Sequence, residues 1–401
     1  MTTYVSSIGS DNADYATVNS WYNAQRQRTD LQDGDVIVAA LQNGQTDSHV
    51  GNHSAEFGNA GTMWSSQKNV TMIVSGTLPD QYRADSFGTH PILDIHQFRY
   101  INAEYHYLTI KFENLDVSSD TRLRFQSNQV ENSSGYEVHF NNLRILQEST
   151  GFFEDFTGDI KALSAVSAAS TDDDKLALIP RSDFYFRNCT WTTTNIANSL
   201  WRNHPTTYNH FRSKVDVVGC TFRMADNSVY SVFQAHAPNT GEIVEYQFNV
   251  SATLYDTSGS TLTNFNDTYD FYSYGNVVDY ISNESTSQFE GWTSSTLVTN
   301  YTQASGFQYG SAPGTNEVAF SADGTGYTYP DFRLYDDSNN IAIDYVTNVT
   351  PPSPDLAGND RGTSPFDAGA FSLISGGGGL PPDTGGVALP LTFAYRINIY
   401  D

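Results

Sequence analysis

The sequence is poor in basic residues: it has 20 Lys and Arg against 45 Asp and Glu, a formal net charge of −25. A chain this acidic repels phosphate backbones, so we expect no nucleic-acid partner. Charged residues of both signs make up only 16% of the chain. The low share of Lys and Glu argues against a helical bundle. It leaves Asn, Ser, Thr, Asp and Gly, which suit turns and strand edges, to form the surface.

Cysteine and long apolar runs are scarce as well. Two Cys in 401 residues do not make a disulfide framework. No run of 18 apolar residues occurs, so we expect no membrane span. The first residues, Met1 to Val5, lack the basic and apolar regions of a secretory signal. This predicts synthesis in a host cytoplasm and, for a protein that works outside, release by lysis or by a dedicated route.

Aromatic residues are abundant, at 13% of the chain, with 25 Tyr and 24 Phe. Disordered acidic chains are poor in aromatics, so this composition predicts a large buried core. One short helix is indicated within residues 1–30, where Val18, Trp21 and Tyr22 follow helical spacing after Asp14, an expected N-cap. We expect this helix to cover the open end of the first β layer and to keep that edge from pairing with another chain.

The rest of the chain is a series of short strands that share one local pattern. Alternating apolar positions lead to an Asn or Gly, which is followed by a small or apolar residue and a new strand. Asn and Gly suit a left-handed residue that turns the chain sharply. The turn positions of these units are separated by 28, 46 and 31 residues. Repeats of this size are typical of a solenoid, although an antiparallel β-sandwich also has many short strands. The turn positions are Asn114, Asn142, Asn188 and Gly219.

Cys189 and Cys220 occupy equivalent places in two successive units. We therefore expect them to stack inside the coil, as a packing ladder first and as a disulfide second, and we expect no metal site there.

The turns at Asn142, Asn188 and Gly219, with their flanking strands, resemble those of right-handed parallel β-helices of the pectate-lyase-like superfamily. The segment 31–37 (LQDGDVI) resembles the start of such helices. D-x-R-L at 331–334, A-I-D at 342–344, D-x-x-G-x-x-R at 355–361 and D-x-G-A-F at 367–371 are similar to the final rungs of many bacterial and phage β-helix proteins. The opening I-G-x4-D-Y-x-T-x3-W resembles β-helix proteins of phages and marine viral sequences.

The resemblance implies an all-β fold: a single-stranded right-handed parallel β-helix over residues 31–374, preceded by the capping helix of residues 1–30. We interpret the late motifs as structural. Arg361 is expected to pair with Asp355 or Asp367 and to close the last rung, and Gly358 and Gly369 are expected to allow tight turns.

The resemblance also implies a chemistry to look for, proton abstraction beside a uronate carboxylate by a basic residue, often next to calcium. This chemistry would need a row of basic side chains on the outer surface, one from each unit. The alternation of side chains along a strand also places polar residues on the outside without any catalytic role. The candidates are Lys111, Arg144, Arg187 and Arg223.

Phage tailspike glycosidases use paired carboxylates instead. With 45 acidic residues, pairs also arise by chance. The candidates are Glu113, Asp116, Asp183 and Asp216. Nothing in the spacing singles out one pair, so we assign no catalytic residue, no metal and no cofactor.

Clusters of Tyr beside Asn and Asp are typical of carbohydrate-binding faces, which use flat stacking and polar contacts. The same residues can pack against protein neighbours, an interpretation that we favour for a multi-copy assembly. The residues concerned are Tyr269, Tyr272, Tyr274, Tyr327 and Tyr329.

Residues 375–401 begin as a Gly/Pro linker and end in an alternating segment that predicts a strand. A tethered strand is suited to adding to the sheet of another subunit, or it folds back on its own helix. The docking side chains are predicted to be Leu391, Phe393, Tyr395, Ile397 and Ile399.

These features predict a non-enzymatic structural protein on the surface of a virus particle, as a capsid decoration or a tail or fibre component. Its expected partners are other virion proteins or copies of itself, in a homo-oligomer, and glycans of the host surface. The alternative is a polysaccharide lyase or glycoside hydrolase of the tailspike type.

Overall fold

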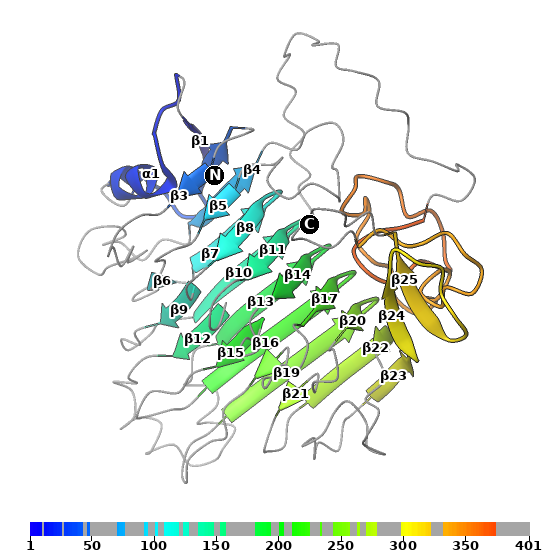
Figure 1. Cartoon of the computed structure of the whole chain (residues 1–401). Helices are drawn as coiled ribbons and strands as arrows, with labels where there is room; N and C mark the ends of the chain where they lie inside the picture. Colours follow the sequence, from blue (N-terminus) through cyan, green and yellow to red (C-terminus); the bar gives the residue numbers. More distant parts are fainter. Residues whose placement is uncertain are drawn as a thin grey trace, which may run out of the picture.

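The computed structural model of the chain describes residues 1–9, 12–25, 28–42, 46–48, 70–76, 92–94, 101–102, 108–119, 123–127, 135–147, 153–157, 181–193, 200–203, 211–224, 233–234, 244–256, 263–264, 270–278, 298–321 and 332–373. These residues are mostly β, with long stacks of parallel strands and very little helix (Figure 1).

The first stack runs the length of the molecule. Its strands pair in parallel from Thr3↔Val36 at one end to Val278↔Gln303 at the other. Its members, in spatial order, are β1 (Thr3–Ile8), β2 (Val36–Leu41), β4 (Thr71–Gly76), β7 (Leu108–Glu113), β10 (Gly135–Asn141), β13 (Arg181–Arg187), β16 (Phe211–Val218), β19 (Val244–Ser251), β22 (Asp270–Val278) and β23 (Val298–Gln303).

Two further parallel stacks lie beside the first. The second stack contains β3 (Thr46–Ser48), β5 (Ile92–Asp94), β8 (Asp116–Ser119), β11 (Arg144–Gln147), β14 (Thr190–Thr193), β17 (Thr221–Arg223) and β20 (Leu254–Asp256). The third stack contains β6 (Ile101–Asn102), β9 (Leu123–Ser127), β12 (Phe153–Thr157), β15 (Trp201–Asn203), β18 (Phe233–Gln234) and β21 (Thr263–Asn264).

The order of the strands along the chain shows how the stacks arise. From β7 the chain passes to β8 in the second stack and β9 in the third, and then returns to the first stack as β10, which pairs with β7. The same cycle repeats through β21. The described residues are thus mostly β and form long stacks of parallel strands, an arrangement compatible with a parallel β-helix. The handedness and the superfamily stay predictions.

The cycle changes at β22. This strand pairs first with β19 and then, at Val277 and Val278, with β20 of the second stack. Its pairing with β23 skips one residue between Tyr274 and Asn276, which is a bulge. Beyond β23, the strands β24 (Gly306–Tyr309) and β25 (Glu317–Phe320) form a separate parallel pair.

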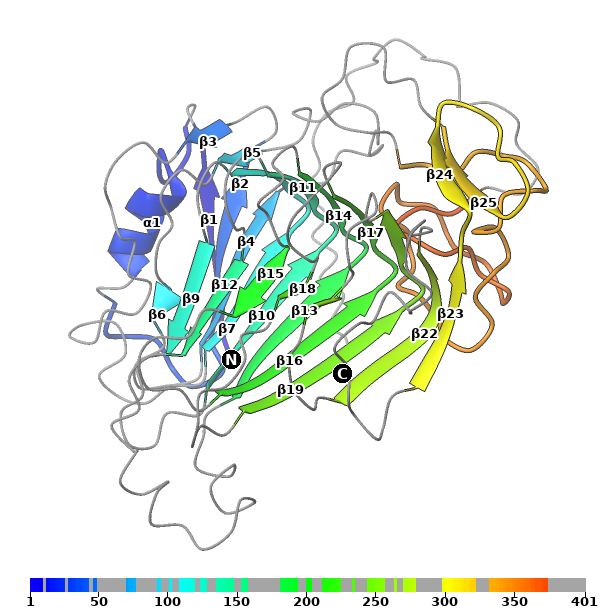
Figure 2. The same cartoon turned by 60° about the horizontal axis from the view of Figure 1, so that its bottom comes forward.

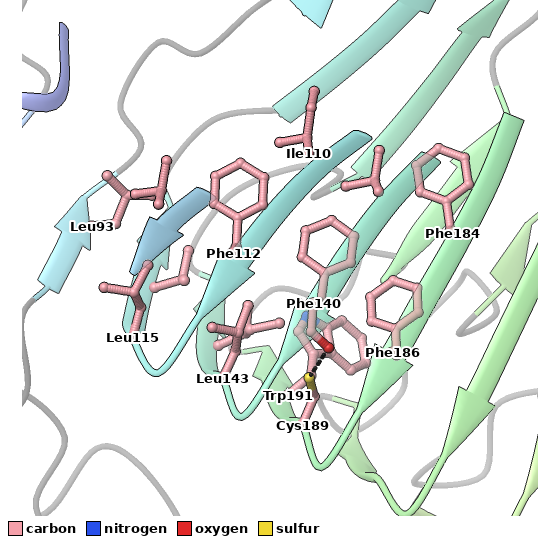
Figure 3. Close-up of a cluster of buried hydrophobic side chains, with 14 of the residues drawn as sticks. Leu93, Ile110, Phe112, Leu115, Phe140, Leu143, Phe184, Phe186, Cys189 and Trp191 are labelled. Atoms are coloured by element: carbon pink, nitrogen blue, oxygen red, sulfur yellow. Dashed lines mark hydrogen bonds between the residues drawn. The ribbon is translucent and has the colours of Figure 1, made fainter. Parts of the chain in front are cut away.

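The interior is filled by side chains that repeat from strand to strand. Phe112, Phe140 and Phe186 are register partners, and their rings stack with centroids 5.6 and 4.8 Å apart (Figure 3). In the second stack, the rings of Trp191 and Phe222 pack edge to face with their centroids 6.4 Å apart. Such aromatic pairs add about 0.5–1.5 kcal/mol each beyond the area they bury. The stacked rings therefore help to fix the register of neighbouring strands.

The predicted helix is α1 (Val18–Gln25), and it buries Val18, Trp21 and Tyr22 in the core cluster that begins the stacks. Its N-cap is Thr17 rather than Asp14: Ser20 N donates to Thr17 Oγ1 at 3.0 Å, and Thr17 N donates to Ser20 Oγ at 3.1 Å. This reciprocal pair satisfies two backbone donors of the first turn. Asp14 instead accepts hydrogen bonds from the backbone and hydroxyl of Ser7.

Residues 344–373, which we call the clasp, follow a different course from the final rungs that the sequence motifs led us to expect. They form no strand and lie against the outer side of the second stack, toward the end that carries β24 and β25 (Figure 2). Gly369 N donates to Ala252 O at 2.8 Å, and Ala370 N donates to Thr221 Oγ1 at 3.1 Å. Four prolines explain the difference, since they cannot donate to a ladder: Pro351, Pro352, Pro354 and Pro365.

Candidate functional site

Polar side chains form a continuous surface on the outside of the first stack. In β13, Phe184 and Phe186 point into the core, while the alternate residues Tyr185 and Arg187 are partly exposed. The same alternation holds in the neighbouring strands, because the pairing is parallel and in register. We call this surface the polar face, and its members are Lys111, Glu113, Glu137, His139, Asn141, Asp183, Tyr185, Arg187, Lys214, Asp216 and Asn249.

The central row of the polar face follows one register position across five strands. Its residues each stand three places before the turn residue of their unit: Lys111, His139, Tyr185, Asp216 and Asn249. Neighbouring strands lie about 4.8 Å apart, so the row presents one side chain at each such step.

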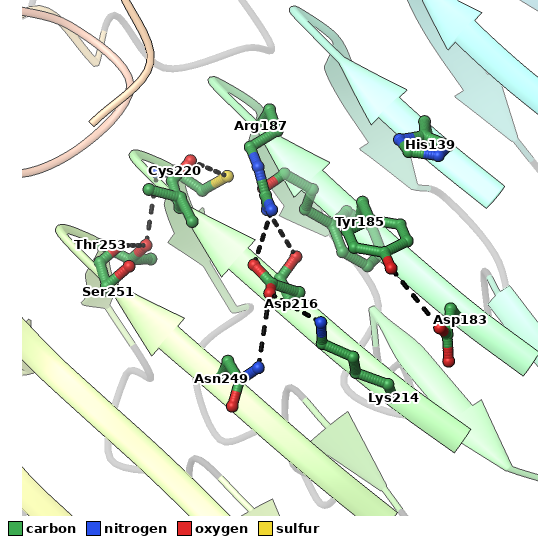
Figure 4. Close-up of polar contacts among 12 residues, drawn as sticks. His139, Asp183, Tyr185, Arg187, Lys214, Asp216, Cys220, Asn249, Ser251 and Thr253 are labelled. Carbon is green, nitrogen blue, oxygen red and sulfur yellow. Dashed lines mark hydrogen bonds and ion pairs between the residues drawn. The ribbon is translucent and has the colours of Figure 1, made fainter. Parts of the chain in front are cut away.

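Tyr185 lies between side chains of the two neighbouring strands (Figure 4). The His139 ring of β10 stacks on it with centroids 4.6 Å apart, and the Lys214 ammonium of β16 lies 5.3 Å from its centroid. Its hydroxyl donates to Asp183 at 3.4 Å, and His139 in turn contacts Glu137 at 2.8 Å. Because its neighbours occupy the ring faces, Tyr185 offers a ligand its edge and hydroxyl rather than a flat stacking surface.

Asp216 joins three neighbours on the same face. Its carboxylate is 2.7 Å from Arg187 Nη2 and 3.4 Å from Lys214 Nζ, and it accepts a hydrogen bond from Asn249 Nδ2 at 3.4 Å. The Arg187 Nη1 group donates to the backbone oxygens of Phe186 and Asp216, both at 3.0 Å. The side chains of the polar face are thus held in place by each other.

The carboxylate candidates divide between two surfaces. Glu113, Asp183 and Asp216 lie on the polar face, where Glu113 accepts a hydrogen bond from Asn141. Asp116 belongs to the second stack instead, and it forms a fully buried bidentate ion pair with Arg144. Asp116 was therefore wrongly grouped with the surface carboxylates, because it follows the turn and the others precede it.

The predicted outward ladder of basic residues is wrong for the same reason. Lys111 and Arg187 precede the turn and lie on the polar face, whereas Arg144 and Arg223 follow it and lie in the second stack. Arg223 packs over the Tyr309 ring at 4.1 Å and lies 3.6 Å from Asp256, whose carboxylate accepts the Tyr309 hydroxyl at 2.6 Å. These contacts tie β24 to the second stack.

The turn residues have the predicted left-handed backbone. Their φ angles are 59° at Asn114, 55° at Asn142, 51° at Asn188 and 64° at Gly219. Ala252, with φ 51°, holds the same position in the next unit. This turn could not be predicted from its residue type, because alanine rarely adopts this conformation.

The asparagine side chains form a ladder along the turns. Asn142 Nδ2 donates to Asn114 Oδ1 at 3.0 Å, and Asn188 Nδ2 donates to Asn142 Oδ1 at 3.2 Å. The ladder ends at the clasp, where Asn188 also donates to Pro354 O at 2.7 Å and accepts from Arg361 Nη2 at 3.2 Å. The next turn residue is Gly219, which has no side chain to continue the ladder. Arg361 bonds to Asn188 in its place.

Arg361 bonds to carbonyls rather than to the carboxylates that were expected to pair with it. It donates to the backbone oxygens of Pro352, Gly369 and Asp367, at 2.8, 2.8 and 3.4 Å. The Asp355 carboxylate accepts the amides of residues 357, 359 and 372, and Asp367 accepts those of residues 344 and 373. Burial raises the pKa of both carboxyls and lowers the pKa of Arg361. The predicted ion pair of Arg361 with Asp355 or Asp367 is therefore wrong, because backbone groups take up the donors and acceptors of all three side chains.

Cys189 and Cys220 stack inside the coil as free, buried thiols. Cys189 N donates to Cys220 Sγ at 3.3 Å, and Cys189 Sγ donates to Phe140 O at 3.1 Å. Burial raises the pKa of the Cys220 thiol well above its ordinary value. The packing ladder, the first of the two expected arrangements, is the one present.

Several predicted site residues are not placed by the structure. Tyr269, Tyr327, Tyr329 and the five docking residues of the tail lie outside the described residues. Tyr272 and Tyr274 belong to β22, where their backbones pair with Asn249 and Ser251. The register places Tyr272 next to the central row of the polar face.

Comparison of the chain with protein-family models, with curated proteins and with solved structures finds no match. In the part of the chain that the structure describes, no helix is long and apolar enough to cross a membrane. In the same part, no three or more His, Cys, Asp or Glu side chains are grouped as metal ligands.

Proposed function

We propose that this chain is a non-enzymatic structural protein, displayed on the surface of a virus particle, whose polar face binds glycans. The observation that carries the binding role is the set of contacts around Asp216, which holds donors and acceptors of three adjacent strands in fixed positions. Sugar hydroxyls both donate and accept, and side chains already held in place lose little conformational entropy on binding.

The ion pairs of the polar face favour binding over catalysis. Arg187 and Lys214 both contact Asp216, and Glu137 contacts His139. The charged side chains at the centre of the face are therefore already engaged with one another. Acid–base chemistry needs a group free to exchange its proton with the substrate.

The place on a virus particle rests on the resemblance of the opening to phage and marine viral β-helix proteins, on that of the late motifs to bacterial and phage ones, and on the tethered strand predicted for the tail. Its test is purification of particles from infected cells, followed by identification of the proteins that accompany this chain. Recovery of the chain only in the particle-free fraction would contradict this part of the proposal.

The glycan role is tested by calorimetry of the full chain against a panel of neutral and acidic polysaccharides. Binding to at least one of them, weakened about tenfold or more by Asn249→Ala, is the expected result. Asp336→Asn, on an exposed loop away from the polar face, serves as the control. Cleavage of any polysaccharide in the panel, seen as new reducing ends or as ultraviolet absorbance, would favour the lyase or hydrolase alternative.

A further inference from the structure

Two cations of the polar face share one carboxylate. Arg187 approaches Asp216 Oδ1 from β13 at 2.7 Å, and Lys214 approaches Oδ2 along β16 at 3.4 Å. The side chains are partly buried, with 28%, 21% and 16% exposed for Arg187, Lys214 and Asp216. Solvent screening is therefore weaker here than at a fully exposed pair.

The Nη1 group of Arg187 is engaged as well. It donates to two backbone oxygens, and the guanidinium lies 5.5 Å from the Tyr185 ring centroid. An anionic ligand would therefore compete with Asp216 and with these backbone oxygens for the guanidinium. Breaking such a pair leaves a carboxylate uncompensated, which costs more than the new contact returns.

The charge on and around the polar face also disfavours the binding of an anionic ligand. The face carries the cations Lys111, Arg187 and Lys214, and its carboxylates are Glu113, Glu137, Asp183 and Asp216. The whole chain has a formal net charge of −25, so the approach of a polyanion is opposed at long range as well.

From these contacts we infer that Asp216 is the specificity-determining residue of the polar face, and that it restricts binding to neutral glycans by neutralising Arg187 and Lys214. The inference rests on the proposed glycan role. It predicts that removing the charge of Asp216 frees two adjacent cations and opens the face to uronate chains.

The experiment compares a neutral β-glucan, a galactomannan and polygalacturonate as ligands of the full chain and of Asp216→Asn. The natural chain is expected to bind a neutral polymer and to bind polygalacturonate at least about tenfold more weakly. Asp216→Asn is expected to raise the affinity for polygalacturonate about tenfold. That gain should fall as salt rises, because the new contacts are between charges.

Two further variants make the result specific. Asp336→Asn changes the net charge equally but lies off the face, so it should give no gain. Arg187→Gln combined with Asp216→Asn removes a freed cation and should abolish most of the gain, provided that circular dichroism shows each variant folded.

The outcomes separate the two proposals. Equal binding of neutral and uronate polymers by the natural chain would overturn the role of Asp216 and leave glycan binding intact. An Asp216→Asn variant that gains no uronate binding would overturn it too. Binding of no polysaccharide by either chain would remove the proposed glycan role together with this inference.

Discussion

Arg144 and Asp116 form an ion pair that solvent does not reach, with both side chains fully buried. The guanidinium donates from Nε and Nη2 to the two carboxylate oxygens, at 2.6 and 2.5 Å. Because the pair joins register partners of β8 and β11, it links two successive units of the second stack. A buried charge that loses its partner is costly, since water cannot replace the lost contact.

Replacing Arg144 by Met should therefore lower the free energy of unfolding by about 3–5 kcal/mol. Denaturant unfolding followed by fluorescence measures the change. The double variant Arg144→Met with Asp116→Leu is the control, because it removes both charges and should recover most of the loss. Equal destabilisation by the single and double variants would show that the lost pair is not the cause.

Asn142 combines two roles in one side chain. Its backbone has φ 55°, and its amide both donates to Asn114 and accepts from Asn188. Replacement by Ala should cost about 1–2 kcal/mol for the left-handed backbone. The two lost hydrogen bonds should add about 1–3 kcal/mol.

Asn142→Gly separates the two roles, because glycine adopts positive φ freely but cannot hydrogen-bond through a side chain. The Gly variant should be less destabilised than the Ala variant in the same denaturant measurement. If Gly were the more harmful of the two, backbone strain could not be the reason for asparagine at this turn.

Asp35 fixes the first strand to the second, since its carboxylate accepts the amides of Thr2 at 2.7 Å and Gln32 at 2.8 Å. These bonds favour the ionised form, and the amide of Gln32 contributes most to lowering the pKa of Asp35. A carboxyl with a lowered folded-state pKa stabilises the fold fully above its unfolded pKa of about 4, and that contribution is progressively lost as the pH falls from there through the folded-state pKa.

Asp35→Asn should thus lower the unfolding temperature at pH 7, and the difference from the natural chain should shrink as the pH approaches 3. Thermal unfolding followed by circular dichroism across this range measures it, with Asp336→Asn as the control. A difference that stays constant from pH 7 to pH 3 would contradict the assignment.

At the scale of elements, the clasp has no strand of its own, yet several hydrogen bonds anchor it to the stacks. Gly219 has no side chain at the turn, and a Cβ there would meet Pro352 at 3.2 Å and Asn188 Oδ1 at 3.3 Å. The missing asparagine therefore makes the space in which the clasp docks. Arg361 then bonds to Asn188 from this position, so the clasp is held at one particular unit.

Gly369 packs tightly against the second stack. A Cβ there would lie 2.8 Å from both Leu254 Cδ1 and Thr221 Oγ1, with φ at +100°. Gly369→Ala should loosen the clasp, which hydrogen exchange would show as faster exchange across residues 344–373.

Gly358→Ala is the matched control for Gly369→Ala. Its φ is +84°, but nothing lies within 4 Å of the added Cβ. It shares the backbone strain without the steric clash, so it should leave the exchange of Ala370 and Gly369 nearly unchanged. Equal effects of both variants would mean that strain alone governs the clasp.

At the scale of the whole molecule, two core clusters meet along the second stack. One runs from α1 through the stacked interior to Tyr255, and the other joins Leu146, Ala252 and Leu254 to the residues that follow β23. In the described part of the chain, the last member of the second cluster is Phe371.

The sequence predicts that residues 376–401 are a Gly/Pro tether with a strand that docks on another subunit, so their deletion should leave the unfolding temperature within about 2 °C of the full chain. It should abolish incorporation into particles, because the docking strand predicted for the tail would be gone. Scanning calorimetry and particle purification measure the two results. Unchanged incorporation would remove the docking role of the tail.

The parts of the fold that sequence reasoning predicted are those that recur. Asn114, Asn142 and Asn188 were identified as turns because each ends an alternating strand, and their positive φ confirms it. The polar face was not recognised as a unit, although its central row stands at a constant offset before each turn. Comparison of the units by this offset would have placed Tyr185, Asp216 and Asn249 together.

The amino-acid sequence by itself determined the mostly β class, a short helix near the N-terminus and the turn positions, because these follow from local periodicity and from the backbone preferences of single residues. Only the tertiary structure decided that Arg144 is buried and Arg187 partly exposed, and that the clasp lies beside the stacks rather than on their end. The physical reason is that stacking brings together residues many positions apart. Whether an outward side chain meets water or another segment then depends on what covers its strand.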